Sequence, residues 1–135
     1  MPGAPDEISL YAGVGYRSRA VSCCRWAVRL DGFFSWRCDY TNGHLVTKPF
    51  TFAGDALFIN FSTSALGGVR IRLLDEKGRP IPGYDSGVHF GDDTDREVAF
   101  EAPLAALAGK PVRMEIAMKD ADLYSFRFHE TVVIR

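Results

Sequence analysis

One stretch decides the fold that the sequence predicts: Arg25-Trp26-Ala27-Val28-Arg29-Leu30-Asp31-Gly32-Phe33-Phe34-Ser35-Trp36-Arg37. Two runs of alternating side chains flank an Asp-Gly pair within it. Asp and Gly tolerate the positive φ angles of a type I′ turn, so this arrangement predicts a two-residue β-hairpin. We therefore expect residues 25–30 to pair with residues 33–38, with Asp31-Gly32 at the turn.

In this register the two faces of the hairpin carry different side chains. The first face holds apolar side chains that we assign to the core: Trp26, Val28, Leu30 and Phe33. The opposite face collects two more aromatic rings beside two arginines: Arg25, Arg29, Phe34 and Trp36. A strand of a β-sandwich needs only one apolar face. The second face is therefore predicted to bind a ligand.

Strand-length segments separated by turn residues recur along the rest of the chain. Apolar side chains occupy every second position in residues 56–62, 69–75, 96–101 and 111–118. Residues 81–89 are loop-like, and the one helical segment, 103–108, is only one or two turns long. The pattern predicts an all-β protein, namely an antiparallel two-sheet β-sandwich of the jelly-roll, concanavalin A-like type. A length of 135 residues fits one domain over residues 7–135 after a linker or domain edge at 1–6.

Composition and charge exclude several classes of function. A net charge of −1 argues against a nucleic-acid partner, which usually requires a basic excess. No apolar run approaches the length of about 18 residues that a membrane span needs, so we expect a soluble domain with no membrane partner. The N-terminal residues lack the basic and apolar regions of a signal peptide, and the compartment is not indicated.

The three cysteines are an odd and small set: Cys23, Cys24 and Cys38. The hairpin register makes Cys24 and Cys38 diagonal neighbours, and a disulfide between them would need distortion. We expect free thiols. No histidine stands at zinc-ligand spacing from the cysteines, so no zinc site is expected.

Seven sequence blocks, in order, carry a resemblance to a known family. They are Glu-Ile-Ser-Leu-Tyr at 7–11, Arg-aromatic-x-x-Arg-Leu-Asp-Gly-Phe at 25–33, Val-Thr-Lys-Pro at 46–49, Asn-Phe-Ser-Thr-Ser at 60–64, Phe-Gly-Asp at 90–92, Leu-Ala-Gly-Lys-Pro-Val-Arg at 107–113 and Lys-Asp-Ala-Asp-Leu-Tyr-Ser-Phe at 119–126. Together they resemble the C-terminal β-sandwich region of bacterial proteins similar to glycoside hydrolase family 32. In such proteins a five-bladed propeller carries the catalytic carboxylates. The resemblance implies a non-catalytic accessory domain that packs beside such a propeller or contacts carbohydrate.

The acidic residues give no independent sign of an enzyme. A glycosidase needs two carboxylates at a defined separation, whereas those of this chain lie mostly in turns. No Gly-x-Ser-x-Gly elbow or phosphate loop appears either. Arginines at 69–75 and 111–118 are expected to pair with glutamates such as Glu115 across neighbouring strands.

One acidic loop raises calcium as a possible cofactor, through Asp92, Asp93 and Asp95. Its Asp-Asp-x-Asp spacing lacks the glycine and terminal glutamate of an EF-hand loop. We expect a solvated turn here and no cofactor.

Carbohydrate is the partner that the sequence favours, because a sugar site pairs an aromatic plate with hydrogen-bonding side chains. Phe34 and Trp36 are the candidate plate. The candidate donors and rim residues are Arg25, Arg29, Asn60, Tyr40 and Tyr84. Trp36 has a second interpretation as core or interdomain packing. The alternative function is a structural module whose aromatic face packs on a propeller domain or on a second copy of the chain.

Overall fold

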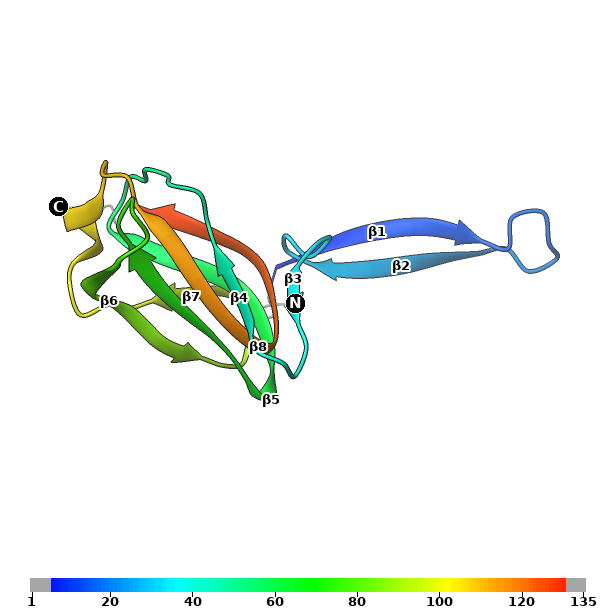
Figure 1. The fold of residues 1–135 in the computed structure, drawn as a ribbon. Coiled ribbons are helices and arrows are strands. Elements are labelled where there is room, and N and C mark those ends of the chain that lie inside the picture. The colour runs from blue at the N-terminus through cyan, green and yellow to red at the C-terminus, as the bar shows by residue number, and fades with distance from the viewer. Residues whose placement is uncertain (1–5, 131–135) are drawn as a thin grey trace. The chain divides into compact units, whose positions relative to one another are not determined.

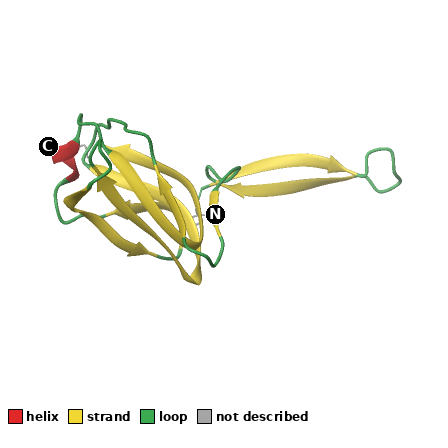
Figure 2. Cartoon of the chain, viewed as in Figure 1, coloured by secondary structure: helices red, strands yellow, loops and turns green. Residues whose placement is uncertain are grey.

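The computed structural model describes residues 6–130, so most of the expected linker at 1–6 lies outside the described residues. The described chain is almost entirely antiparallel β-structure (Figure 2). Contacts divide it into two compact units, residues 1–34 and residues 35–135, and the single domain expected over 7–135 spans both. Between residues 6 and 130, no helix is long and apolar enough to cross a membrane.

The first unit is a β-hairpin. Strand β1 (Glu7–Val14) pairs antiparallel with β2 (Ser22–Arg29) (Figure 1). The register places Leu10 opposite Trp26 and Glu7 opposite Arg29. The predicted pairing of residues 25–30 with 33–38 is therefore wrong. Residues 36–38 form β3 (Trp36–Cys38), which belongs to the second unit.

The Asp-Gly pair lies in a turn, but the predicted type I′ turn centred on Asp31-Gly32 does not form, because the turn hydrogen bond spans residues 29–32 and Gly32 lacks the positive φ that such a turn requires. Asp31 has a φ of 55°, and the backbone N–H of Gly32 donates a 2.9 Å hydrogen bond to the Arg29 carbonyl. A turn signal is local, so it fixes the backbone of two or three residues but does not choose the pairing partner. Here β2 has an eight-residue partner that precedes it in the chain.

The second unit is one six-stranded sheet around two long strands, β5 (Ala56–Leu74) and β8 (Arg113–His129). β6 (Pro80–His89) and β7 (Asp92–Val98) pair with β5. β3 and β4 (Gly43–Val46) pair with β8. The 3₁₀ helix η1 (Leu104–Leu107) matches the short helical segment expected at 103–108. Residues 81–89, expected as a loop, lie instead in β6.

A break in register between Thr63 and Gly68 divides β5 and β8 into two halves. Inward side chains of both halves belong to the same core, including Leu57, Ile59, Phe61, Val69, Ile71, Leu73, Met114 and Ile116. The alternation of apolar side chains in 56–62, 69–75 and 111–118 thus marks the core face as predicted. The other face carries the polar and charged side chains from which a surface site can be built.

Candidate functional site

The structure separates the predicted ligand-binding face. Arg25 and Arg29 lie on β2 and Phe34 follows the turn after it, all in the first unit. Trp36, Tyr40, Asn60 and Tyr84 lie in the second unit. The pairing that placed Phe34 and Trp36 opposite the two arginines does not form, so no single hairpin face unites these residues.

In the first unit, Arg25 is tied to the neighbouring strand. Its guanidinium forms an ion pair with Glu7 and donates hydrogen bonds of 3.1 and 3.0 Å to Ser9 Oγ. Phe34 is 87% exposed. Cross-strand contacts of this kind stabilise a hairpin. They also use N–H donors of Arg25 that the sequence analysis assigned to a ligand.

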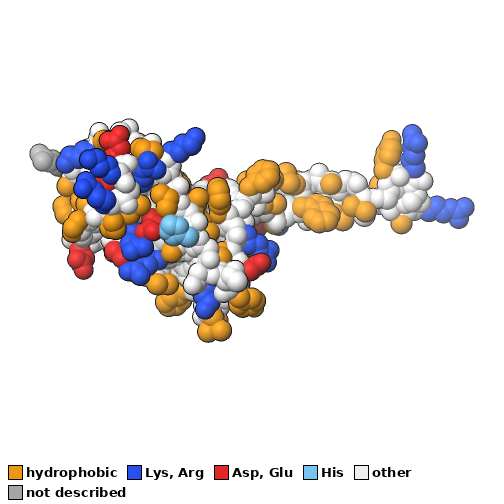
Figure 3. Space-filling model, in the orientation of Figure 1, with side chains coloured by type: hydrophobic (Ala, Val, Ile, Leu, Met, Phe, Trp, Pro, Cys, Tyr) orange, Lys and Arg blue, Asp and Glu red, His pale blue; other side chains and the backbone are white. Residues whose placement is uncertain are grey.

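The opposite face of this hairpin is apolar. The β1–β2 register brings together Ile8, Leu10, Ala12, Val14, Cys24, Trp26 and Val28. Trp26 is 59% exposed, so its assignment to the core was wrong, and Leu30 and Phe33 are exposed as well. Figure 3 shows apolar side chains gathered along the hairpin.

Trp36 lies on the surface of the second unit. It stands opposite the buried Leu123 on β8, yet its own side chain is 61% exposed. Ser35 Oγ donates a 2.7 Å hydrogen bond to Asp122 and anchors the start of β3. Tyr40, in the turn after β3, is 74% exposed. The exposure of Trp36 argues against core packing within this unit and leaves its ring accessible.

Asn60 and Tyr84 lie in the core and not at a surface rim. Asn60 is 2% exposed and Tyr84 is 5% exposed. Tyr84 is on β6 and not in a loop, and its hydroxyl donates a 2.9 Å hydrogen bond to the Pro103 carbonyl. Both residues hold the fold together, and neither is available to a ligand on the surface.

The acidic residues expected in a solvated turn lie instead in strand β7, where arginines engage them. Asp93 forms an ion pair with Arg96 at 3.0 Å, and Asp95 forms one with Arg127 at 2.7 Å. Asp92 also has an interaction partner. Between residues 6 and 130, no group of three or more His, Cys, Asp or Glu side chains is placed to hold a metal ion.

The three cysteines are free thiols, as expected. Cys24 lies opposite Ala12 in the hairpin and not diagonal to Cys38. Cys38 is buried, and its thiol donates a 2.8 Å hydrogen bond to the Thr41 carbonyl. The hydrogen bond closes the turn that leads from β3 to β4.

A surface groove of about 420 Å³ lies where β4, β8, β5 and β6 meet, and the sequence did not predict it. Its lining comes from these four strands and from the turns beside them: Asn42, Gly43, His44, Leu66, Gly67, Gly68, Arg70, Val88, Ala117, Met118 and Lys119. Arg70 and Ala117 alternate along their strands with the buried Ile71 and Ile116, so they belong to the face away from the core.

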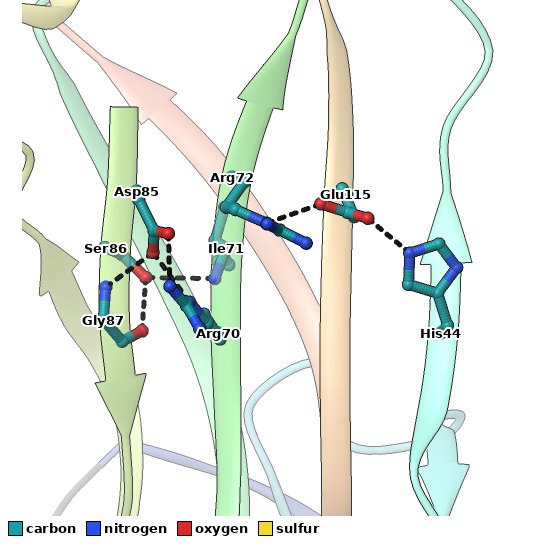
Figure 4. Close-up of polar contacts among 8 residues, drawn as sticks. All are labelled: His44, Arg70, Ile71, Arg72, Asp85, Ser86, Gly87 and Glu115. Carbon is teal, nitrogen blue, oxygen red and sulfur yellow. Dashed lines mark hydrogen bonds and ion pairs between the residues drawn. The ribbon is translucent and has the colours of Figure 1, made fainter. Parts of the chain in front are cut away.

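A charged network borders the groove (Figure 4). Glu115 on β8 accepts a hydrogen bond from His44 on β4 and forms a 2.6 Å ion pair with Arg72 on β5, which confirms the expected pairing of an arginine of 69–75 with Glu115. Burial alone would raise the pKa of Glu115, but the hydrogen bond from His44 and the charge of Arg72 hold it below its usual value.

Arg70 and Asp85 form a second pair in Figure 4, between β5 and β6. The hydrogen bond from Arg70 lowers the pKa of Asp85, and the same bond raises the pKa of Arg70. Ser86 Oγ accepts a 3.0 Å hydrogen bond from the backbone N–H of Ile71. Asp85 is therefore ionised at neutral pH, and it holds the guanidinium of Arg70 in place beside the groove.

Of the side chains that line this groove, the sequence analysis considered only Arg70, as one of the arginines of residues 69–75. Charged side chains that alternate with core residues are typical of any solvated sheet face, so they do not by themselves indicate a concave surface. The lining of the groove comes from four strands that are distant in sequence, and the absence of a side chain at Gly68 leaves space beside Val88. No family model, curated protein or solved structure matches the chain.

Proposed function

We propose that this chain is a non-catalytic accessory module of a glycoside-hydrolase-like protein, that the single hydrogen-bonded sheet of its second unit folds over into the two layers of a β-sandwich, and that it binds carbohydrate. The observation that carries this proposal is Trp36, an indole on a hydrogen-bonded strand whose side chain is nevertheless 61% exposed. The ordered resemblance of the seven sequence blocks to the C-terminal region of family 32-like proteins supports the same function.

The chemistry of a sugar suits this surface. A pyranose or furanose ring presents a flat face of C–H groups, which packs on an aromatic plate, and hydroxyl groups at its edge. Trp36 provides the plate, and its backbone is fixed by pairing with β8. Tyr40, four residues further on and also exposed, supplies a second ring with a hydroxyl. A ring held by a strand loses little conformational freedom when the sugar binds.

A glycan array on the intact chain, followed by Trp36→Ala, tests this function. We expect the variant to weaken binding by about 1–3 kcal/mol, the usual cost of losing a stacked ring at a contact. Its melting temperature should stay unchanged because the ring is not part of the core. Phe90→Ala is the matched control, since Phe90 is similarly exposed in the same unit. Glycan binding that survives Trp36→Ala, or no glycan binding at all, would contradict the proposal.

A docking module is the second candidate, and the apolar face of the β1–β2 hairpin favours it. An isolated two-stranded hairpin is marginally stable in water, and an uncovered face containing Leu10, Val14 and Trp26 fits another protein surface. The partner would be a propeller domain or a second copy of the chain. Sedimentation of the intact chain, made alongside the array, distinguishes the two functions, because self-association without glycan binding favours docking.

A further inference from the structure

The groove on the β4–β8–β5–β6 face has the size of a small-molecule site. Its volume of about 420 Å³ falls within the range of about 300–1,000 Å³ typical of ligand pockets. Gly68 keeps part of it open: a Cβ there would lie 2.4 Å from Cγ1 of Val88, which also lines the groove. A larger residue at position 68 would fill this part of the groove or displace Val88.

The charged side chains that line the groove are cationic. Arg70 and Lys119 line it together with His44, and no carboxylate is among its lining residues. Asp85 binds Arg70 from β6, so the guanidinium is held in one orientation while it remains 46% exposed. Lys119 is exposed and forms no ion pair within residues 6–130. The groove therefore offers an anion one oriented cation and one unneutralised cation.

The remaining walls are apolar or amide-bearing. Val88 and Leu66 contribute large, exposed apolar side chains, and Asn42 supplies an amide. Tyr40 precedes Asn42 by two residues in the same turn. Apolar contact, amide hydrogen bonding and two cations together suit a ligand that has C–H faces, hydroxyl groups and a carboxylate.

We propose that this groove binds the carboxylate-bearing sugar of an acidic saccharide. Arg70 and Lys119 would hold the carboxylate, Val88 and Leu66 would pack against the ring, and Asn42 would bind a hydroxyl. The choice of a saccharide rests on the proposed function, whereas the requirement for a carboxylate rests on the cationic lining of the groove. A charge-assisted hydrogen bond is about twice as strong as a neutral one, so the carboxylate is the main determinant of affinity.

Titration calorimetry with three probes tests this inference on the intact chain. The probes are a trisaccharide of galacturonate, the matched neutral trisaccharide of galactose, and succinate, which carries carboxylates without a sugar ring. We expect the galacturonate probe to bind at least about tenfold more tightly than either of the others. Its affinity should fall as salt is added, because Lys119 is solvent-exposed.

Two variants locate the binding. Lys119→Gln and Arg70→Gln should each weaken binding of the galacturonate probe about tenfold or more. Lys110→Gln, an exposed lysine outside the groove, is the control and should have no effect. Arg70→Lys keeps the charge but loses the paired hydrogen bonds to Asp85, so it should fall between Arg70→Gln and the unmodified chain.

The outcomes separate this inference from the proposed function. Galacturonate binding that is lost in Trp36→Ala and kept in Lys119→Gln would overturn the groove and leave carbohydrate binding in place. If the neutral trisaccharide bound as tightly as the galacturonate trisaccharide, the requirement for a carboxylate alone would be overturned. Equal binding of succinate would show a site for any carboxylate and overturn the saccharide. Binding of none of the three probes would overturn the groove, and an empty glycan array would then overturn the proposed function as well.

Discussion

At the scale of single residues, His89 is an unusual member of the second unit. It ends β6 opposite the fully buried Val69, and its Nε2 atom is buried with no hydrogen-bond partner among residues 6–130. Burial lowers the pKa of His89 from its usual 6.5, and the nearby positive charge of Arg96 lowers it further. The neutral imidazole is the form that fits the fold.

Stability should therefore depend on pH through His89. The unfolded chain takes up a proton at this side chain as the pH falls below about 6.5, before the folded chain does. The stabilisation is complete above pH 6.5 and decreases as the pH falls toward the lowered pKa of the folded state. Urea denaturation at pH 7.0 and 5.5 measures the free energy of unfolding at each pH. The difference between the two values should be smaller in His89→Phe than in the unmodified chain. A difference of the same size in both proteins would contradict the assignment to His89.

At the scale of elements, the core depends on the second unit alone. Every residue of the core cluster, from Cys38 to Phe128, belongs to residues 35–135. The β1–β2 hairpin contributes strand pairing and the contacts of Arg25 within its own unit. Its sheet has only two strands, which is too few for independent stability in water.

Deletion of residues 1–34 should leave a folded protein. We expect residues 35–135 to unfold cooperatively, with a melting temperature within about 4 °C of the intact chain, which corresponds to less than about 1 kcal/mol for a domain of this size. Calorimetry on both forms measures the difference, and circular dichroism of a peptide of residues 1–34 should show little stable strand. A truncated chain that lacks a cooperative transition would show that the hairpin stabilises the core.

The elements also show which features could be predicted from the sequence. Strands with strict alternation, such as the halves of β5 and the first half of β8, were found because one face packs in the core. The pairing of β3 with β8 could not be predicted. Ser35 and Asp122, which are hydrogen-bonded where these strands meet, lie 87 positions apart, and no local signal connects them. β6 was missed because Pro82 and Gly83 interrupt its alternation. It pairs with β5 on one side and shows register shifts, which tolerate such residues.

At the scale of the whole molecule, several carboxylates are paired with cations, and three of them show a lowered pKa. Asp75 binds Arg79, Asp85 binds Arg70, and Glu115 binds both Arg72 and His44. The pKa of each of these three carboxyls is lowered. A general acid in glycoside hydrolysis needs the opposite shift, toward a raised pKa, which an apolar pocket or a neighbouring carboxylate produces.

We therefore predict that the intact chain does not hydrolyse glycosides, in agreement with an accessory role. Incubation with an aryl glycoside and with a fructan, followed by a reducing-sugar assay from pH 4 to 8, measures the activity. Turnover that disappears in Asp93→Asn or Asp95→Asn would overturn the prediction, because these carboxylates would then be more than partners of Arg96 and Arg127. Turnover that survives both variants and also Glu115→Gln would instead point to a contaminating hydrolase. The absence of turnover would leave Asp93 and Asp95 with the structural role that their ion pairs with Arg96 and Arg127 give them.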